Sequence, residues 1–137
     1  MDWKECCDKK IAKNVKLDEN LINSLKKTSE NKLKSSEELI MNEINAASKV
    51  PLAYDSLREL LEALSLKKGY KIYNHECYTA FLKEIIGESE KGEEFDKIRI
   101  ERNAINYYAK EISLEEAKDL IDKIKHLRNQ VLNLLNN

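Results

Sequence analysis

Two arginines one helical turn apart carry the most chemical information in this sequence. The chain has 137 residues and 24 basic side chains, of which only four are arginine, namely Arg58, Arg99, Arg102 and Arg128. Arginine differs from lysine because its planar guanidinium offers a fork of donors that fits a carboxylate or a phosphate. The pairing of Arg99 with Arg102 therefore predicts either an anion site or ion pairs with some of the 25 acidic residues.

The segment around these arginines has the periodicity of an amphipathic helix over residues 94–112. Its apolar residues advance in steps of three and four, at Phe95, Ile98, Ile105, Ala109 and Ile112. Arg102 occupies the missing step of this apolar stripe. Because a buried guanidinium without a partner is costly, we expect Arg102 to face a cleft, an interface or a partner carboxylate.

A polar stripe follows the same helix. It contains Arg99, Asn103, Asn106 and Lys110 at spacings of four, three and four, and Asn103 and Tyr107 form a further pair four residues apart. Cationic forks, amides and a phenol can hold a phosphate, hydrogen-bond a base and stack on it. The nucleic-acid- or nucleotide-binding candidates are therefore Arg99, Arg102, Asn103, Asn106 and Tyr107. A polar seam between two helices or two subunits is the alternative explanation of the same residues.

The rest of the chain predicts further helices that would position this face. Residues 15–28 and 35–47 form two helices or one long helix, with a possible capping box at Ser35 and Glu38. Val50–Pro51 predicts a break. Helices are expected over 52–68, from Asn74 to Gly87, and over 114–135 after the capping box of Ser113 and Glu116, with a polar loop at 88–92. Short connections favour antiparallel neighbours, so we predict one domain (1–137) that is all-α, an antiparallel up-and-down bundle of four to five helices.

The charge and composition of the chain limit the partners, location and cofactors that can be expected. The formal net charge of −1 gives no overall attraction to nucleic acid or membrane, and no apolar run reaches the length of a membrane span. A cytoplasmic protein with reduced thiols at Cys6, Cys7 and Cys77 is expected, since the odd count has no metal-like spacing. With two histidines in the chain, no metal site and no cofactor are predicted; the grouping of His75, Glu76 and Cys77 is treated as an ordinary helix start.

The stretch from Arg102 to Tyr108 resembles the motif of the HEPN domains. That family's motif is an arginine, commonly followed by a polar residue such as asparagine, and a histidine four to six residues later. Arg102 and Asn103 match it, and the bundle pattern extends the resemblance over roughly the last two-thirds of the chain. The resemblance implies a metal-independent ribonuclease site shared across a homodimer, here through the 94–112 helix.

Tyr107 stands where the HEPN motif has its histidine. A phenol with an ordinary pKa near 10 is a poor general base near neutral pH, although it can still hydrogen-bond a phosphate or stack on a base. Arg102 and Tyr107 are thus the catalytic candidates of a site in which cleavage is expected to be weak or absent. The function expected is a dimeric RNA- or nucleotide-binding module. The alternative is a non-catalytic helical partner of a small nucleotidyltransferase in a toxin–antitoxin pair.

Overall fold

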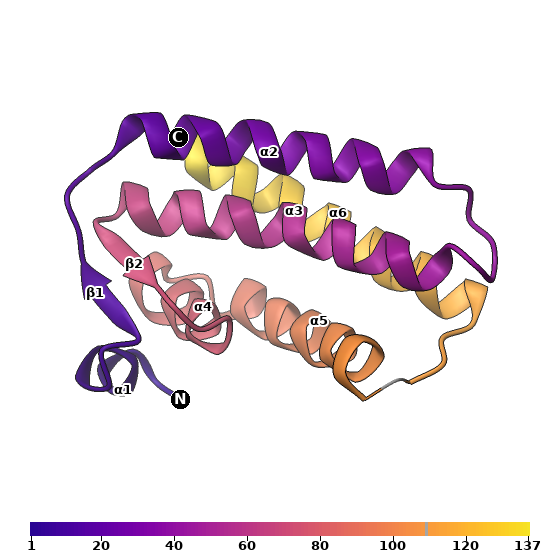
Figure 1. Ribbon diagram of the computed structural model, residues 1–137. Coiled ribbons are helices and arrows are strands. Elements are labelled where there is room, and N and C mark those ends of the chain that lie inside the picture. Colours follow the sequence, from indigo (N-terminus) through magenta and orange to yellow (C-terminus); the bar gives the residue numbers. More distant parts are fainter. Residues whose placement is uncertain (109) are drawn as a thin grey trace.

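The computed structural model describes residues 1–108 and 110–137, and this part of the chain is almost entirely helical (Figure 1). In chain order its elements are α1 (Trp3–Asp8), β1 (Ala12–Asn14), α2 (Glu19–Glu38), α3 (Ala46–Lys67), β2 (Tyr70–Ile72), α4 (Glu76–Ala80), the π-helical segment η1 (Phe81–Ile86), α5 (Ser89–Tyr107) and α6 (Leu114–Asn136). The predicted all-α bundle is confirmed. Ala109, one of the apolar positions of the predicted helix, lies outside the described residues.

Helices α2, α3, α5 and α6 run alternately up and down, and α3 packs against both α2 and α6 (Figure 1). The Ser29 hydroxyl donates to the Ser56 carbonyl, and the Ser36 hydroxyl donates to the Lys49 carbonyl. Residue numbers therefore rise along α2 as they fall along α3, which makes the two helices antiparallel. The residues predicted to face the core from α3 are all buried: Ala53, Leu57, Leu60, Leu61 and Leu64.

The boundary between α2 and α3 differs from the prediction. A single helix runs to Glu38, so Ser35 and Glu38 lie in its last turn and do not open a second helix. The buried ammonium of Lys49 donates to the carbonyls of Ser36 and Leu39 and satisfies this helix end. The chain is irregular from residue 39 to residue 45, because the groups that would continue the helix are already paired with α3.

Pro51 does not interrupt the chain where the sequence predicts a break. It lies inside α3, which begins at Ala46. The turns before the proline are held by packing, since Ala46, Lys49 and Val50 are buried. Proline removes one backbone donor near the start of a helix, and tertiary contacts on the neighbouring residues outweigh that loss.

Helix α5 begins earlier than predicted, because residues 89–92 are helical and not a loop. Gly69 and Gly87 do end their helices as expected, with φ of +91° and +81°. Gly92 has a different role: a Cβ there would lie 2.6 Å from Cγ of Lys83 and 3.0 Å from the Thr79 carbonyl oxygen. The glycine thus permits close packing of α5 on α4 and η1.

Helix α5 also ends earlier than predicted, at Tyr107. Phe95 and Ile98 are buried as expected, and Ile105 is half-buried. Ile112 lies beyond the helix, in the connection to α6, so the predicted range of 94–112 is corrected to 89–107. The capping box at Ser113 and Glu116 is confirmed, and α6 begins directly after it.

Two features near the N-terminus were missed by the sequence analysis. Strands β1 and β2 form a short antiparallel pair, with Ala12 opposite Ile72, which is too brief to show an alternating pattern. A disulfide joins Cys6 to Cys77, so the expectation of three reduced thiols is wrong for two of them, while Cys7 is free and exposed. Across the described residues, none of the helices has the length and apolarity needed to span a membrane.

Candidate functional site

Arg102 lies between two tyrosine rings. Its Cζ is 4.7 Å from the ring centroid of Tyr54 on α3 and 5.3 Å from that of Tyr107 on its own helix. Its Nη1 donates to Oδ1 of Asn103 at 3.2 Å and to the hydroxyl of Tyr107 at 3.1 Å. Within the described chain the guanidinium forms no ion pair, and its buried Nε has no hydrogen-bond partner. We call Tyr54, Arg102, Asn103 and Tyr107 the Arg102 cluster.

Arg102, a charged residue on the apolar stripe of α5, is thus accommodated by contacts with two tyrosine rings. A cation over an aromatic face is attracted by the ring quadrupole, an interaction worth about 0.5–2 kcal/mol depending on exposure. Part of the guanidinium therefore keeps unused donor capacity toward the surface. Tyr107 supplies an exposed ring beside it, with 67% of its surface accessible.

Arg99 occupies a different environment from Arg102. Its Nη2 lies 2.8 Å from Oδ1 of Asp96, which also accepts a hydrogen bond from Thr79 at 3.2 Å. Arg99 lines a cavity of about 420 Å³ next to α1 and α4, together with Met1. Its charge is therefore largely balanced by a carboxylate.

The remaining predicted site residues are only partly brought together. Asn103 belongs to the Arg102 cluster, whereas Asn106 is exposed and the structure gives it no side-chain partner in the described residues. Lys110 lies past the end of α5, with Nζ 3.9 Å from a carboxylate oxygen of Glu116. The predicted polar stripe is thus divided: Arg99 is paired with Asp96, Asn103 contacts Arg102, Asn106 is exposed, and Lys110 lies outside the helix.

Tyr54 and His75 are the site residues that sequence reasoning missed. Tyr54 is fully buried, and its hydroxyl lies 3.0 Å from Nδ1 of His75, just before α4. A buried tyrosine needs a hydrogen-bond partner for its hydroxyl, which is the one sequence signal that could have drawn attention to a nearby histidine. Tyr54 lies on α3 and His75 in the turn before α4, so their contact could not be inferred from spacing.

The environment of His75 keeps its imidazole neutral. Burial, followed by the positive charges of Arg58 and Arg102, lowers the pKa of His75 from 6.5 to about 4, against the opposing charge of Asp55. Burial also raises the pKa of Tyr54 far above its ordinary value, so this phenol stays protonated. The Tyr54 hydroxyl and Nδ1 of His75 thus share one hydrogen bond between neutral groups, and the tautomer of the imidazole sets which of the two donates.

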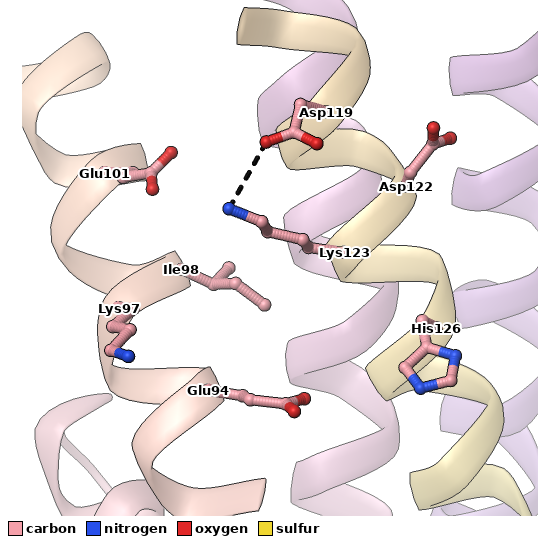
Figure 2. Close-up of a pocket in the computed structure, with 8 residues that line it drawn as sticks. All are labelled: Glu94, Lys97, Ile98, Glu101, Asp119, Asp122, Lys123 and His126. Carbon is pink, nitrogen blue, oxygen red and sulfur yellow. Dashed lines mark ion pairs between the residues drawn. The ribbon is translucent and has the colours of Figure 1, made fainter.

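A separate groove lies between α5 and α6 (Figure 2). It has a volume of about 440 Å³ and is lined by Glu94, Lys97, Ile98, Glu101, Asp119, Asp122, Lys123 and His126. Lys123 extends from α6 toward α5 and pairs with Asp119 at 3.3 Å. Among the described residues no group of three or more histidine, cysteine or carboxylate side chains is placed to hold a metal ion, here or elsewhere.

No family model matches this chain, and neither a curated protein nor a solved structure matches it significantly.

Proposed function

We propose that this chain is a HEPN-like helical-bundle protein whose Arg102 cluster binds a phosphate group of RNA or of a nucleotide. The observation that carries the proposal is the guanidinium of Arg102, which is held between two tyrosine rings without an ion pair in the described residues. A charge placed in this way is available to an incoming anion, because no carboxylate of the chain has to be displaced first.

The neighbours of Arg102 support RNA or a nucleotide over a simple anion. Tyr107 and Tyr108 expose 67% and 80% of their surfaces, and an exposed ring next to a phosphate contact can stack on a base. The Oδ1 of Asn103 accepts a hydrogen bond from Arg102, and the same side-chain amide can also hydrogen-bond the edge of a base. Because the net charge is −1, affinity has to come from this local cluster.

Ribonuclease activity is proposed to be weak or absent. The hydroxyl of Tyr107 accepts a hydrogen bond from Arg102, and a phenol gives up its proton reluctantly near neutral pH. His75 is the nearest imidazole that the structure places beside the Arg102 cluster, and its pKa of about 4 makes it a poor proton acceptor in the free protein. If the protein cleaves RNA, we expect the reaction to need no metal ion, with Arg102 and Tyr107 as the candidate catalytic residues.

The test is incubation of the purified protein with labelled RNA, with and without EDTA, scoring both retention and cleavage. Wild type should retain RNA and cleave it little, and the Arg99→Ala/Arg102→Ala double variant should lose retention. Lys97→Ala is the matched control, because it removes a positive charge from α5 on the side of the α6 groove. Equal retention by wild type and the double variant would show that this face is structural.

A second function is favoured by one specific observation. Arg99 pairs with Asp96 and Lys110 lies near Glu116, so two of the three predicted cations already have carboxylate neighbours. Such pairing is compatible with a non-catalytic helical partner of a small nucleotidyltransferase in a toxin–antitoxin pair. Failure to bind RNA, with co-purification of a nucleotidyltransferase expressed from an adjacent gene, would favour this alternative.

Two further expectations stay predictions. A homodimer through α5 is proposed from the family resemblance and from Ile100, which is exposed on that helix. A cytoplasmic location is proposed from the sequence, and the disulfide between Cys6 and Cys77 is an observation against it, because structural disulfides are rare in reducing compartments.

A further inference from the structure

His75 and Arg102 both contact Tyr54. Nδ1 of the imidazole lies within hydrogen-bond distance of the Tyr54 hydroxyl, at 3.0 Å, and the centroid of the imidazole ring lies 5.7 Å from that of Tyr54. The guanidinium lies over the Tyr54 ring, with Cζ 4.7 Å from the centroid. Both side chains thus contact the same buried ring, in a region where burial weakens solvent screening.

The charged groups around His75 are predominantly positive. Arg58 and Asp55 face it from α3, and Arg99 and Arg102 face it from α5. The ring of Tyr78 on α4 lies 6.3 Å away, and Glu76, the next residue in the chain, lies 3.7 Å from the terminal amine of Met1.

Most of these charges have opposite charges nearby. Arg58 is 3.7 Å from Asp55 and 3.5 Å from Glu62, and Arg99 pairs with Asp96. In the described chain Arg102 is the arginine of this group that forms no ion pair. Of the positive charges that lower the pKa of His75, that of Arg58 has the larger effect and that of Arg102 the next, and of these two only Arg58 has carboxylates beside it in the described residues.

We propose that the affinity of His75 for a proton increases when a phosphate group binds at Arg102, so that anion binding and protonation of His75 favour each other. The inference rests on the proposed function, because it requires a phosphate at Arg102. A bound anion offsets the positive charge of Arg102, which disfavours the imidazolium together with burial and the charge of Arg58. By linkage, the protonated imidazolium strengthens binding of the anion by the same factor.

The direction of the pH effect follows from this coupling. Free His75 is neutral near neutral pH, and the bound anion raises its pKa above the value of about 4 in the free protein. Affinity for a phosphodiester therefore rises as the pH falls toward the pKa of the complex, and it levels off below the pKa of the free protein. Each unit by which binding raises that pKa corresponds to about a tenfold gain in affinity between these limits.

The experiment is an NMR titration of the two histidine rings with and without ligand. Oligouridylate is the main probe, because neither uridine nor a phosphodiester changes charge below neutrality. Uridine 5′-monophosphate is the second probe and distinguishes a terminal phosphate from an RNA backbone. His126 is a matched internal control, since it lies on α6 in the separate acidic groove.

We expect oligouridylate to raise the titration midpoint of His75 by about one unit and to leave that of His126 unchanged. In binding assays across the same pH range, the affinity of wild type should rise about tenfold toward acid. His75→Asn keeps an acceptor for the Tyr54 hydroxyl and should abolish this rise, whereas His126→Asn should preserve it.

The outcomes separate the two proposals. If RNA binds through Arg102 while the midpoint of His75 does not move, the proton linkage is wrong and the proposed function stands. Oligouridylate affinity that rises equally in wild type and His75→Asn also overturns the linkage. If neither probe binds at any pH, both the proposed function and the linkage fail.

Discussion

The guanidinium of Arg102 lies over the ring of Tyr54, with its Cζ 4.7 Å from the ring centroid. This contact joins a residue of α5 to a fully buried residue of α3. It explains how a charged side chain occupies an apolar stripe without an ion pair among the described residues. The same contact makes the fork geometry of Arg102 testable by a substitution that preserves its charge.

Arg102→Lys should weaken RNA binding by roughly 1–3 kcal/mol, because lysine keeps the charge and loses the planar fork. Fluorescence anisotropy with a labelled oligouridylate at several salt concentrations measures the change. Lys97→Arg is the matched control on the α6 side of the same helix and should leave affinity unchanged. An unaltered affinity in Arg102→Lys, with a lower melting temperature, would mean that Arg102 has only a structural role.

Wild type should leave RNA almost uncut in the presence of EDTA, because Tyr107 stands where the HEPN motif that the sequence resembles has its histidine. Tyr107→Phe removes the hydroxyl that accepts from Arg102 and keeps the exposed ring, so RNA retention should change little. The measurement is a time course of product formation on a denaturing gel. Rapid cleavage by wild type that disappears in Tyr107→Phe would identify the phenol as catalytic.

Acid should destabilise the fold through His75. Its pKa is about 4 in the folded protein and 6.5 in its ordinary state, so the unfolded chain binds more protons between these two values. The free energy of unfolding contributed by His75 is therefore present above the higher value and is lost as the pH falls through this window, by roughly 1–3 kcal/mol.

Urea denaturation at a series of pH values measures this contribution. His75→Asn should show a shallower decline of stability across the window than wild type does. His126→Asn controls for the removal of a histidine elsewhere in the chain. Identical slopes for wild type and His75→Asn would contradict the assigned environment of His75.

Reduction of the disulfide between Cys6 and Cys77 should lower stability by about 2–4 kcal/mol, because the bond closes a long loop of the unfolded chain. The double variant Cys6→Ser/Cys77→Ser should show the lowered melting temperature without any reductant. Cys7→Ser, which removes the exposed free thiol, should not. Reaction of three thiols in the native, unreduced protein would show that the bond does not form.

A homodimer through α5 should dissociate when a charge is placed on its exposed apolar residue. Ile100→Glu is the test, and Ile44→Glu is the control because Ile44 is an exposed isoleucine outside that helix. Sedimentation at protein concentrations of tens of micromolar, about the level that populates a standard-size interface, measures the change. If wild type is a monomer at these concentrations, the prediction of a homodimer through α5 is wrong.

The parts of the fold that depend on local sequence were predictable. The capping box of Ser113 and Glu116 starts α6 as expected, and Leu120 and Ile124 are buried. Local sequence signals did not predict the helix boundaries at which side chains distant in the sequence make contacts. The ammonium of Lys49 determines where α2 ends, and close packing on α4 and η1 makes Gly92 part of a helix.

Of the candidate site, the sequence predicted only the residues that lie on α5. Arg102 does contact Asn103, its neighbour in the chain, and Tyr107, five residues further along α5. Tyr54 and His75 come from α3 and from the start of α4, so only the tertiary fold places them beside Arg102. The disulfide likewise joins cysteines that are 71 residues apart, a pairing that spacing alone does not specify.

The contacts of Lys49 have a practical consequence for protein engineering. The ammonium fixes the last turn of α2 against α3, and Asn45 at the start of α3 donates to the side chain of Asn42 and to the carbonyl of Ile40. Within that connection Ile44 exposes 86% of its surface. An affinity tag or a small reporter domain inserted there would enter at a site whose closure adds little entropic cost, and the helix pair would keep its alignment.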